Sequence, residues 1–157
     1  MYKYRSYQPA DKVNVQILNK LSSIGQLDDY ARDKKPLANI ENDYFDKGGH
    51  FWVVDHIKEN KIVGMIGLKI ISSHIAKMKS LRVHPDYRKQ GIAKKLISIL
   101  EEHAQKKGIK KIVLGVGDDK QSLPAIKLYE SLGYELTQKK KKAPGAIALY
   151  YEKNLFT

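Results

Sequence analysis

Four runs rich in apolar and β-branched residues predict β-strands in the first part of the chain. These runs are Tyr2–Tyr7, His50–His56, Lys61–Ile71 and His74–Val83. The last three follow one another closely, and the polar stretch "IKEN" separates the first two of them. We therefore expect the last three runs to form an antiparallel meander.

The run His74–Val83 changes its apolar period partway along. Ala76 and Met78 are apolar at even positions, whereas Leu81 and Val83 are apolar at odd positions. A β-bulge between Met78 and Leu81 would absorb this slip of one residue. Because bulges leave backbone groups unpaired and often lie beside active sites, this strand is a candidate wall of a functional site.

Apolar residues at helical spacing predict amphipathic helices between the strands. The first predicted helix follows Pro9 and is capped by Asp11. Its apolar face comprises Val13, Ile17, Leu21 and Ile24. A second helix ends at Gly108. Its apolar stripe comprises Ile92, Leu96, Ile97, Leu100 and Ala104.

The remaining pattern predicts one more helix and three more strands. They are the strand Lys110–Val116, the helix Ser122–Tyr134, and the terminal strands Tyr134–Gln138 and Ile147–Glu152. Four lysines within Gln138–Pro144 precede a Pro-Gly turn, and we interpret them as a solvated loop between the terminal strands. The pattern weakens between Gly25 and Gly49, where short helical pieces and loops are expected.

Length and composition narrow the class of protein. A chain of 157 residues suits one domain, residues 1–157, with a core of its own. The absence of cysteine excludes disulfides, thiolate metal sites and cysteine nucleophiles, and no other spacing predicts a metal site. No apolar run reaches the roughly 20 residues that span a bilayer, and "MYKYRSYQPAD" has no apolar signal core. We expect a cytoplasmic protein without a membrane partner. Its net charge of +12 favours anionic partners such as nucleic acid, an acidic membrane surface or a phosphorylated cofactor.

The stretch "HPDYRKQGIAKKL" joins the bulged strand to the second helix. A helix that begins directly after Gly91 presents unsatisfied backbone N–H groups and the positive end of its dipole, which together form an anion site. Ala93 adds little bulk there, and nearby cations surround the site. These cations are Arg88, Lys89 and Lys94. Neither the nucleotide P-loop nor the dinucleotide fingerprint is present, so the pattern favours a different phosphate-bearing ligand.

The motif R-x-x-G-x-A at Arg88 to Ala93, its V-x-P-x-Y-R lead-in and the later A-I-x-L-Y-x-x-x-G-Y helix resemble one family. This is the GNAT superfamily of acyl-CoA-dependent N-acetyltransferases. The resemblance covers Phe51 to Tyr134, and the first strand and helix agree in order. It implies an α/β (α+β) fold with a mixed, mostly antiparallel central sheet, flanked by helices and split between the fourth and fifth strands.

The resemblance also implies an acetyl-CoA site. The backbone of Leu81, Arg82 and Val83 would pair with the pantetheine arm, and the amides from Lys89 to Lys94 would hold the pyrophosphate with help from Arg88 or Lys89. An N–H of Leu81 or Arg82 would polarise the thioester carbonyl, and Tyr129 would protonate the leaving thiolate, although a helical tyrosine is also a common core residue. The implied cofactor-binding residues are Leu81, Arg82, Val83, Arg88, Lys89, Gln90, Gly91, Ile92, Ala93, Lys94, Ser122 and Tyr129.

The chain departs from the family pattern at two places. Lys79 and Ser80 stand where many relatives carry an acidic base, and Ser122 replaces a common asparagine. Ser122 could donate a hydrogen bond to the cofactor or cap the helix. Several residues remain open as replacement bases. They are Glu41, Asp43, His50, His74 and His84.

We therefore expect an N-acetyltransferase that moves an acetyl group from acetyl-CoA to a primary amine by direct attack in a ternary complex. Two alternatives remain: a non-catalytic acyl-CoA sensor and, less favoured, a basic nucleic-acid-binding protein. The acceptor is a small-molecule amine or a protein amino group, and a homodimer is compatible with the sequence. Aromatic and acidic residues would either form a pocket for a cationic amine or serve as ordinary packing. They are Asp28, Asp29, Tyr30, Glu41, Asp43, Tyr44, Phe45 and Trp52.

Overall fold

The predicted strands form one seven-stranded sheet in the computed structural model, which describes residues 1–22 and 37–156. The strands are β1 (Tyr2–Ser6), β2 (His50–His56), β3 (Lys61–Ile70), β4 (Ile75–Val83), β5 (Lys111–Gly117), β6 (Glu135–Ala143) and β7 (Ala146–Asn154). The α-helices are α1 (Lys12–Ser22), α3 (Ile40–Asp43), α4 (Ile92–Lys106) and α5 (Leu123–Ser131). Short 3-10 turns are η1 (Pro9–Asp11), η2 (Phe45–Lys47) and η3 (Pro85–Tyr87).

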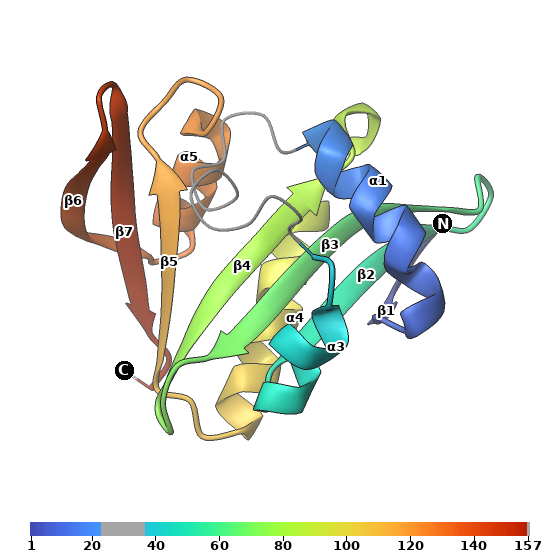
Figure 1. The fold of residues 1–157 in the computed structure, drawn as a ribbon, viewed down its shortest axis with the longest axis horizontal. Coiled ribbons are helices and arrows are strands. Elements are labelled where there is room, and N and C mark those ends of the chain that lie inside the picture. Colours follow the sequence, from blue (N-terminus) through green and yellow to red (C-terminus); the bar gives the residue numbers. More distant parts are fainter. Residues whose placement is uncertain (23–36, 157) are drawn as a thin grey trace.

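The sheet has the strand order β1-β2-β3-β4-β5-β7-β6. Every neighbouring pair is antiparallel except β4 and β5, which are parallel because α4 carries the chain back between them. The parallel ladder is short and runs only from Ile75 with Lys111 to Lys77 with Val113. Beyond it the two strands diverge (Figure 1). The mixed, mostly antiparallel sheet with a split between its fourth and fifth strands is confirmed.

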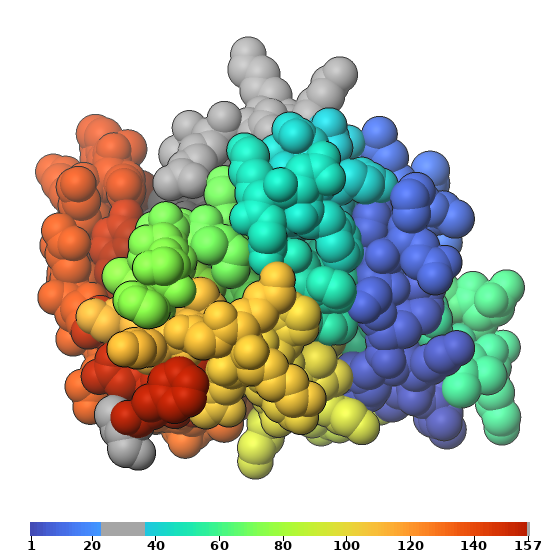
Figure 2. Space-filling view, turned by 90° about the horizontal axis from the view of Figure 1, so that it is seen from below, coloured from blue at the N-terminus to red at the C-terminus, as the bar shows by residue number. Residues whose placement is uncertain are grey.

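Helices cover both faces of this sheet. Figure 1 shows α1 and α3 in front of it and α4 behind it. The rear core contains the side chains of α4 at the predicted stripe Ile92, Leu96, Ile97, Leu100 and Ala104. The front core is smaller and contains residues such as Phe51, Val53 and Met65. In Figure 2 the α3 and η2 segment lies between α1 and the β3–β4 turn. None of the helices within residues 1–22 and 37–156 is long and apolar enough to cross a membrane.

The face of α1 that packs on the sheet is not the face predicted from the sequence. Val13, Ile17 and Leu21 are 66%, 53% and 49% exposed, while Val15 and Leu18 are buried. Ile24 lies outside the described residues. The true buried stripe also contains Asn19 and Ser22, and these two polar residues hide its helical period.

The lysine-rich segment is a strand, so its interpretation as a loop is wrong. β6 extends to Ala143, and all of its nine residues are exposed. The turn is instead formed by Pro144 and Gly145, where Gly145 has φ +77°. β6 is the last strand in the sheet order, so its lysines lie on an edge strand. Charged side chains on an edge strand disfavour pairing with the strands of other chains.

Candidate active site

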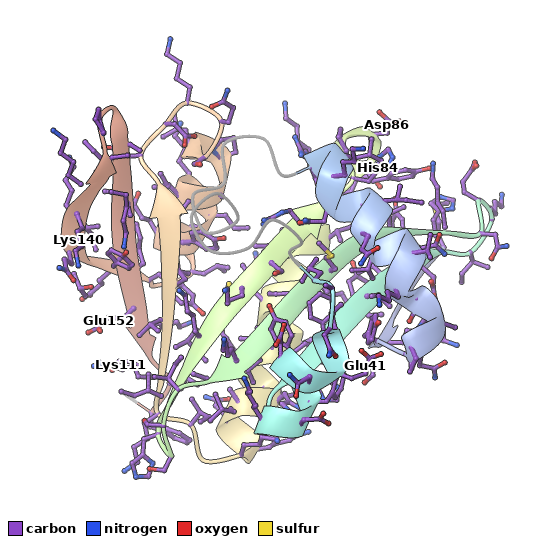
Figure 3. All side chains as sticks on the ribbon, viewed as in Figure 1. Glu41, His84, Asp86, Lys111, Lys140 and Glu152 are labelled. Carbon is purple, nitrogen blue, oxygen red and sulfur yellow. The ribbon has the colours of Figure 1, made fainter. Side chains whose placement is uncertain are left out.

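The split between β4 and β5 begins directly after the pair Lys77 and Val113. Among the described residues, no strand pairs with β4 on this side from Met78 to Val83. Figure 3 labels His84 and Asp86 at the open end of β4, and Lys111 and Glu152 near the closed end where the two strands pair. One edge of β4 therefore offers backbone groups to a ligand that enters the split.

The predicted bulge lies beside this split. Lys79 pairs with Gly67 and Arg82 pairs with Met65, so two residues of β4 occupy the space opposite the single residue Ile66. The two residues are Ser80 and Leu81. Ser80 has φ +58°, in the left-handed region that non-glycine residues rarely adopt. The bulge between Met78 and Leu81 is confirmed.

The direction of the amides in β4 follows from one hydrogen bond. The His84 N–H donates to the Val63 carbonyl at 2.8 Å, toward β3. Because successive residues of a strand direct their amides to opposite edges, the N–H groups of Val83 and Leu81 point into the split and that of Arg82 points toward β3. Of the two predicted oxyanion donors, Leu81 has the required direction.

Two arginines contact the carbonyl oxygens of the same edge. A guanidinium N–H of Arg82 donates to the Leu81 oxygen at 3.0 Å. The Arg88 Nε–H donates to the Val83 oxygen at 3.2 Å. The predicted pantetheine-binding edge thus continues directly into the predicted phosphate-binding loop, with positive charge at both places.

The helix α4 begins at the place where the sequence predicts an anion site. Gly91 is the cap residue with φ +80°, and its carbonyl accepts the Lys95 N–H at 3.1 Å. The amides of Ile92, Ala93 and Lys94 precede this bond and have no acceptor within the helix. A Cβ at Gly91 would meet nothing within 4 Å. The space beside Gly91 is therefore open, which would leave room for a phosphate group at this end of the helix.

Aromatic contacts hold the loop before α4 in place. The His84 Nδ1 accepts the Asp86 N–H at 3.1 Å, and the Tyr87 ring packs against the rings of His84 and His56. The Tyr2 hydroxyl donates to the Gln90 side chain. The sequence did not indicate these links to β1 and β2, because they join residues far apart in the chain.

Ser122, directly before α5, and Tyr129 within α5 are the two cofactor-binding residues predicted in this part of the chain, and both are buried. Ser122 is the cap residue, and its own N–H donates to the Asp119 carboxylate at 2.8 Å. Tyr129 belongs to the rear core, which Leu81 also contacts. Its ring centroid is 6.0 Å from that of Tyr134, whose hydroxyl donates to Glu101 at 2.7 Å. Burial and the Glu101 carboxylate raise the pKa of Tyr134.

The five candidate bases lie outside the bulge itself. The Tyr7 hydroxyl donates to Glu41 at 3.3 Å, and His74 belongs to the β3–β4 turn. His50 lies on β2, with its Nε2 2.7 Å from the Ser6 Oγ. Burial, with the charges of His103 and Lys107, lowers the pKa of His50 to about 4. Asp43 is the last residue of α3.

The suggested aromatic acceptor pocket is not formed as expected. Trp52 belongs to the rear core and Tyr44 to the front core, so the sheet separates them. Asp28, Asp29 and Tyr30 lie outside the described residues. Sequence reasoning missed a different role for Tyr44, whose hydroxyl lies 3.2 Å from the Ser80 Oγ at the bulge.

Comparisons with known proteins identify the family of this chain. The sequence pattern of the acetyltransferase (GNAT) family matches residues 16–134. N-acetyltransferase 8 from Homo sapiens is 31% identical over 107 residues, which are 64% of this chain and 45% of that protein. The chain thus matches less than half the length of this relative.

Solved structures share the fold. A GNAT-family acetyltransferase from Staphylococcus aureus Mu50 has a TM-score of 0.80 and 24% identity, with 99% of each chain covered. An aminoglycoside 6'-N-acetyltransferase solved with coenzyme A has a TM-score of 0.76 and 18% identity, with 99% of this chain and 98% of that chain covered.

Proposed function

Because the chain belongs to the acetyltransferase (GNAT) family, we propose that it transfers an acetyl group from acetyl-CoA to a primary amine. The observation that carries this proposal is the continuity of the open β4 edge with the amino end of α4. Backbone donors at Leu81 and Val83 and at the start of α4 lie along one stretch of chain. This arrangement suits a ligand with an amide-bearing arm at one end and a phosphate group at the other.

The loop and the helix would hold the phosphate end of the cofactor. The amides of Ile92, Ala93 and Lys94 combine unsatisfied donors with the positive end of the helix dipole. The side chains of Arg88, Lys89 and Gln90 flank this end and add charge or hydrogen bonds. The open space at Gly91 supports this assignment, since a larger residue would occupy it.

The bulge would activate the acetyl group. The Leu81 N–H points into the split and has the direction needed to donate to the thioester carbonyl oxygen. Such a donor stabilises the negative charge that develops on this oxygen as the carbonyl carbon becomes tetrahedral. The β3 ladder on one side and the Tyr44 contact on Ser80 hold the bulge in place.

Direct attack of the amine on the thioester requires no acyl-enzyme intermediate. Acetyl-CoA supplies an activated thioester. The neutral amine nitrogen bonds to the acetyl carbon, the carbon–sulfur bond breaks, and the Tyr129 hydroxyl gives its proton to the departing sulfur. The amine loses a proton to water, and Tyr129 regains one from solvent. Direct attack fits a chain without cysteine.

The proposal is tested by following thiol release from acetyl-CoA with a panel of primary amines. Amine-dependent release without an initial burst supports direct transfer, and a burst of one equivalent would contradict it. Tight acetyl-CoA binding without turnover of any amine would favour the sensor. Nucleic-acid binding that weakens steeply with salt and ignores acetyl-CoA would favour the remaining alternative.

A further inference from the structure

The lysine run of β6 lies on the outer edge of the sheet, away from the proposed active site. β6 is the last strand in the order β4-β5-β7-β6, so β5 and β7 separate it from the split beside β4. Figure 1 shows β6 at the left edge of the molecule, and Figure 3 labels Lys140 there. Lys139 to Lys142 are consecutive residues of this strand, and all of them are exposed. The proposed acetyl transfer uses none of them.

Two of these lysines extend from the rear face of the sheet. Lys139 pairs with Leu149 of the rear core, and Lys141 pairs with Ile147, which packs against that core. Residues that lie opposite each other in an antiparallel ladder project to the same face. The Lys139 ammonium lies 3.6 Å from the Asp118 carboxylate, and among the described residues this is the salt bridge that the lysine run forms.

The other two lysines extend from the front face. Lys140 and its partner Ala148 alternate with the rear-facing pairs, so both project to the front. The Lys142 ammonium lies 5.6 Å from the centre of the Tyr150 ring, which is two residues along β7 from Ala148 and thus on the same face. Each face of this edge therefore carries two ammonium groups.

The backbone of β6 also has groups that point away from the sheet. The Asp118 N–H donates to the Ile147 carbonyl at 2.9 Å, so Ile147 directs its N–H and C=O toward β5 and the next residue of β7 directs them toward β6. Lys140 pairs with that next residue and completes the ladder between β6 and β7. The N–H and C=O groups of Lys139 and Lys141 therefore point outward, where they can pair with another extended chain.

These features favour a peptide strand over other anionic partners. The outward groups include donors and acceptors, and a peptide backbone can pair with both, whereas phosphate oxygens only accept. A strand added to this edge places successive side chains on alternate faces, and lysines are present on each face. A flat membrane surface would meet the lysines of one face. A second copy of the chain, paired edge to edge, would place lysines opposite lysines, which is unfavourable.

We propose that the outer edge of β6 binds an extended acidic segment of another protein as an added strand. Carboxylates at consecutive positions of that segment would lie beside the lysines on both faces of the sheet, while its backbone pairs with Lys139 and Lys141. The lysines that disfavour pairing with a basic or apolar strand thereby select an acidic one. This inference concerns a partner of the chain and does not depend on the proposed acetyl transfer.

The test measures the binding of fluorescein-labelled hexaglutamate, with hexaglutamine as its neutral match. Lys140→Gln combined with Lys141→Gln removes one charge from each face of the edge. The control combines Lys58→Gln in the β2–β3 turn with Lys106→Gln at the end of α4, so that two exposed lysines elsewhere are replaced and the net charge falls equally. Fluorescence anisotropy at low salt gives the affinities.

We expect wild type and the control to bind hexaglutamate with affinities within about twofold of each other. The variant that combines Lys140→Gln and Lys141→Gln should bind it about tenfold more weakly, because two charge pairs are lost at the edge. Hexaglutamine should bind none of these proteins measurably.

A second comparison separates strand addition from charge attraction alone. Lys141→Pro and Lys141→Gln remove the same charge, but only proline also removes the outward N–H, and it leaves the hydrogen bonds to β7 intact. We expect Lys141→Pro to bind hexaglutamate about fivefold more weakly than Lys141→Gln. In the wild type, hexaglutamate should slow hydrogen exchange at the Lys139 and Lys141 amides, which the ladder with β7 does not protect.

Other results would overturn the inference. Failure of the wild type to bind hexaglutamate, or equal losses in the control and in the lysine variant, would refute the site. Unchanged hydrogen exchange at Lys139 and Lys141 with the peptide bound would show charge attraction without an added strand. Tighter binding of hexauridylate or of phosphatidylserine vesicles, with the same dependence on Lys140 and Lys141, would identify a nucleic-acid or membrane surface instead.

Discussion

The Tyr44 hydroxyl lies 3.2 Å from the Ser80 Oγ and joins the segment after α3 to the bulge of β4. The Tyr44 ring can reach this position because Gly67 of β3 has no side chain beneath it. Ser80 has the left-handed backbone that shapes the bulge, so this contact supports the backbone next to the Leu81 amide. The front layer is thereby coupled to the proposed oxyanion donor.

Gly67→Ala should therefore weaken both stability and catalysis. The new Cβ would lie 2.5 Å from the Tyr44 Cε1 and 3.0 Å from the Phe51 Cδ2, which forces the rings away from the bulge. We expect a loss of about 1–3 kcal/mol in the free energy of unfolding and a lower kcat. Urea denaturation and initial rates measure the two effects.

Gly64→Ala on the same strand is the matched control. Its Cβ would meet only side-chain methyl groups, at 3.0 Å from Ile92 and 3.1 Å from Val54. We expect this variant to lose stability but to keep its kcat. A Gly67→Ala enzyme with the kcat of Gly64→Ala would show that Tyr44 does not support the bulge.

Tyr129→Phe should slow turnover without weakening cofactor binding. Removing a general acid typically costs about 100-fold or more in rate, while the packing of the ring is retained. Rates are measured with a saturating acceptor whose chemical step limits turnover. Tyr134→Phe is the control, since it removes the neighbouring hydroxyl that is bound to Glu101 and should lower stability more than rate. Equal rates for Tyr129→Phe and wild type would remove the acid assignment.

Stability should fall when the solution is acidified from about pH 6.5 toward pH 4. The folded protein holds the pKa of His50 at about 4, below its ordinary value near 6.5 in the unfolded chain. The unfolded state thus binds more protons in this window, and stability is present above it and lost as the pH falls. Because His50 is only half-buried, we expect it to account for about 1 kcal/mol between pH 7.5 and pH 5.

Urea midpoints at the two pH values measure this loss, and His50→Gln identifies its source. The variant lacks the titrating ring, so its stability should depend less on pH than that of the wild type. The His103 pKa is also lowered by burial and by Lys107 and Lys106, so part of the dependence should remain. A His50→Gln protein with the full wild-type loss would contradict the assignment.

The fold could be predicted where local patterns were strong. The apolar stripe of α4 and the slip between Met78 and Leu81 each predicted the element that is observed. The buried face of α1 was missed because Asn19 and Ser22 interrupt its pattern. The lysine-rich second half of β6 was taken for a loop because a strand exposed on both faces has no apolar alternation.

At the candidate site the sequence indicated the local backbone geometry but not the contacts between distant residues. The loop motif located Gly91 and the start of α4, since their geometry depends on neighbouring residues. The choice between Leu81 and Arg82 required the hydrogen bond from His84 to Val63. The Tyr44 contact with Ser80 joins residues 36 positions apart, and no local pattern indicates such a contact.

If the amino end of α4 holds acetyl-CoA, calorimetry should distinguish the variants Gly91→Val and Gly108→Val. Both glycines have nearly the same positive φ, +80° and +81°, and open space at the Cβ, but they lie at opposite ends of α4. Either valine should cost about 1–2 kcal/mol of stability through backbone strain.

Only Gly91→Val would place its side chain in the proposed phosphate site. We expect wild type and Gly108→Val to bind acetyl-CoA with similar affinity, while folded Gly91→Val binds about 100-fold more weakly or worse. Equal affinity of the two variants, or no binding by the wild type, would contradict this expectation.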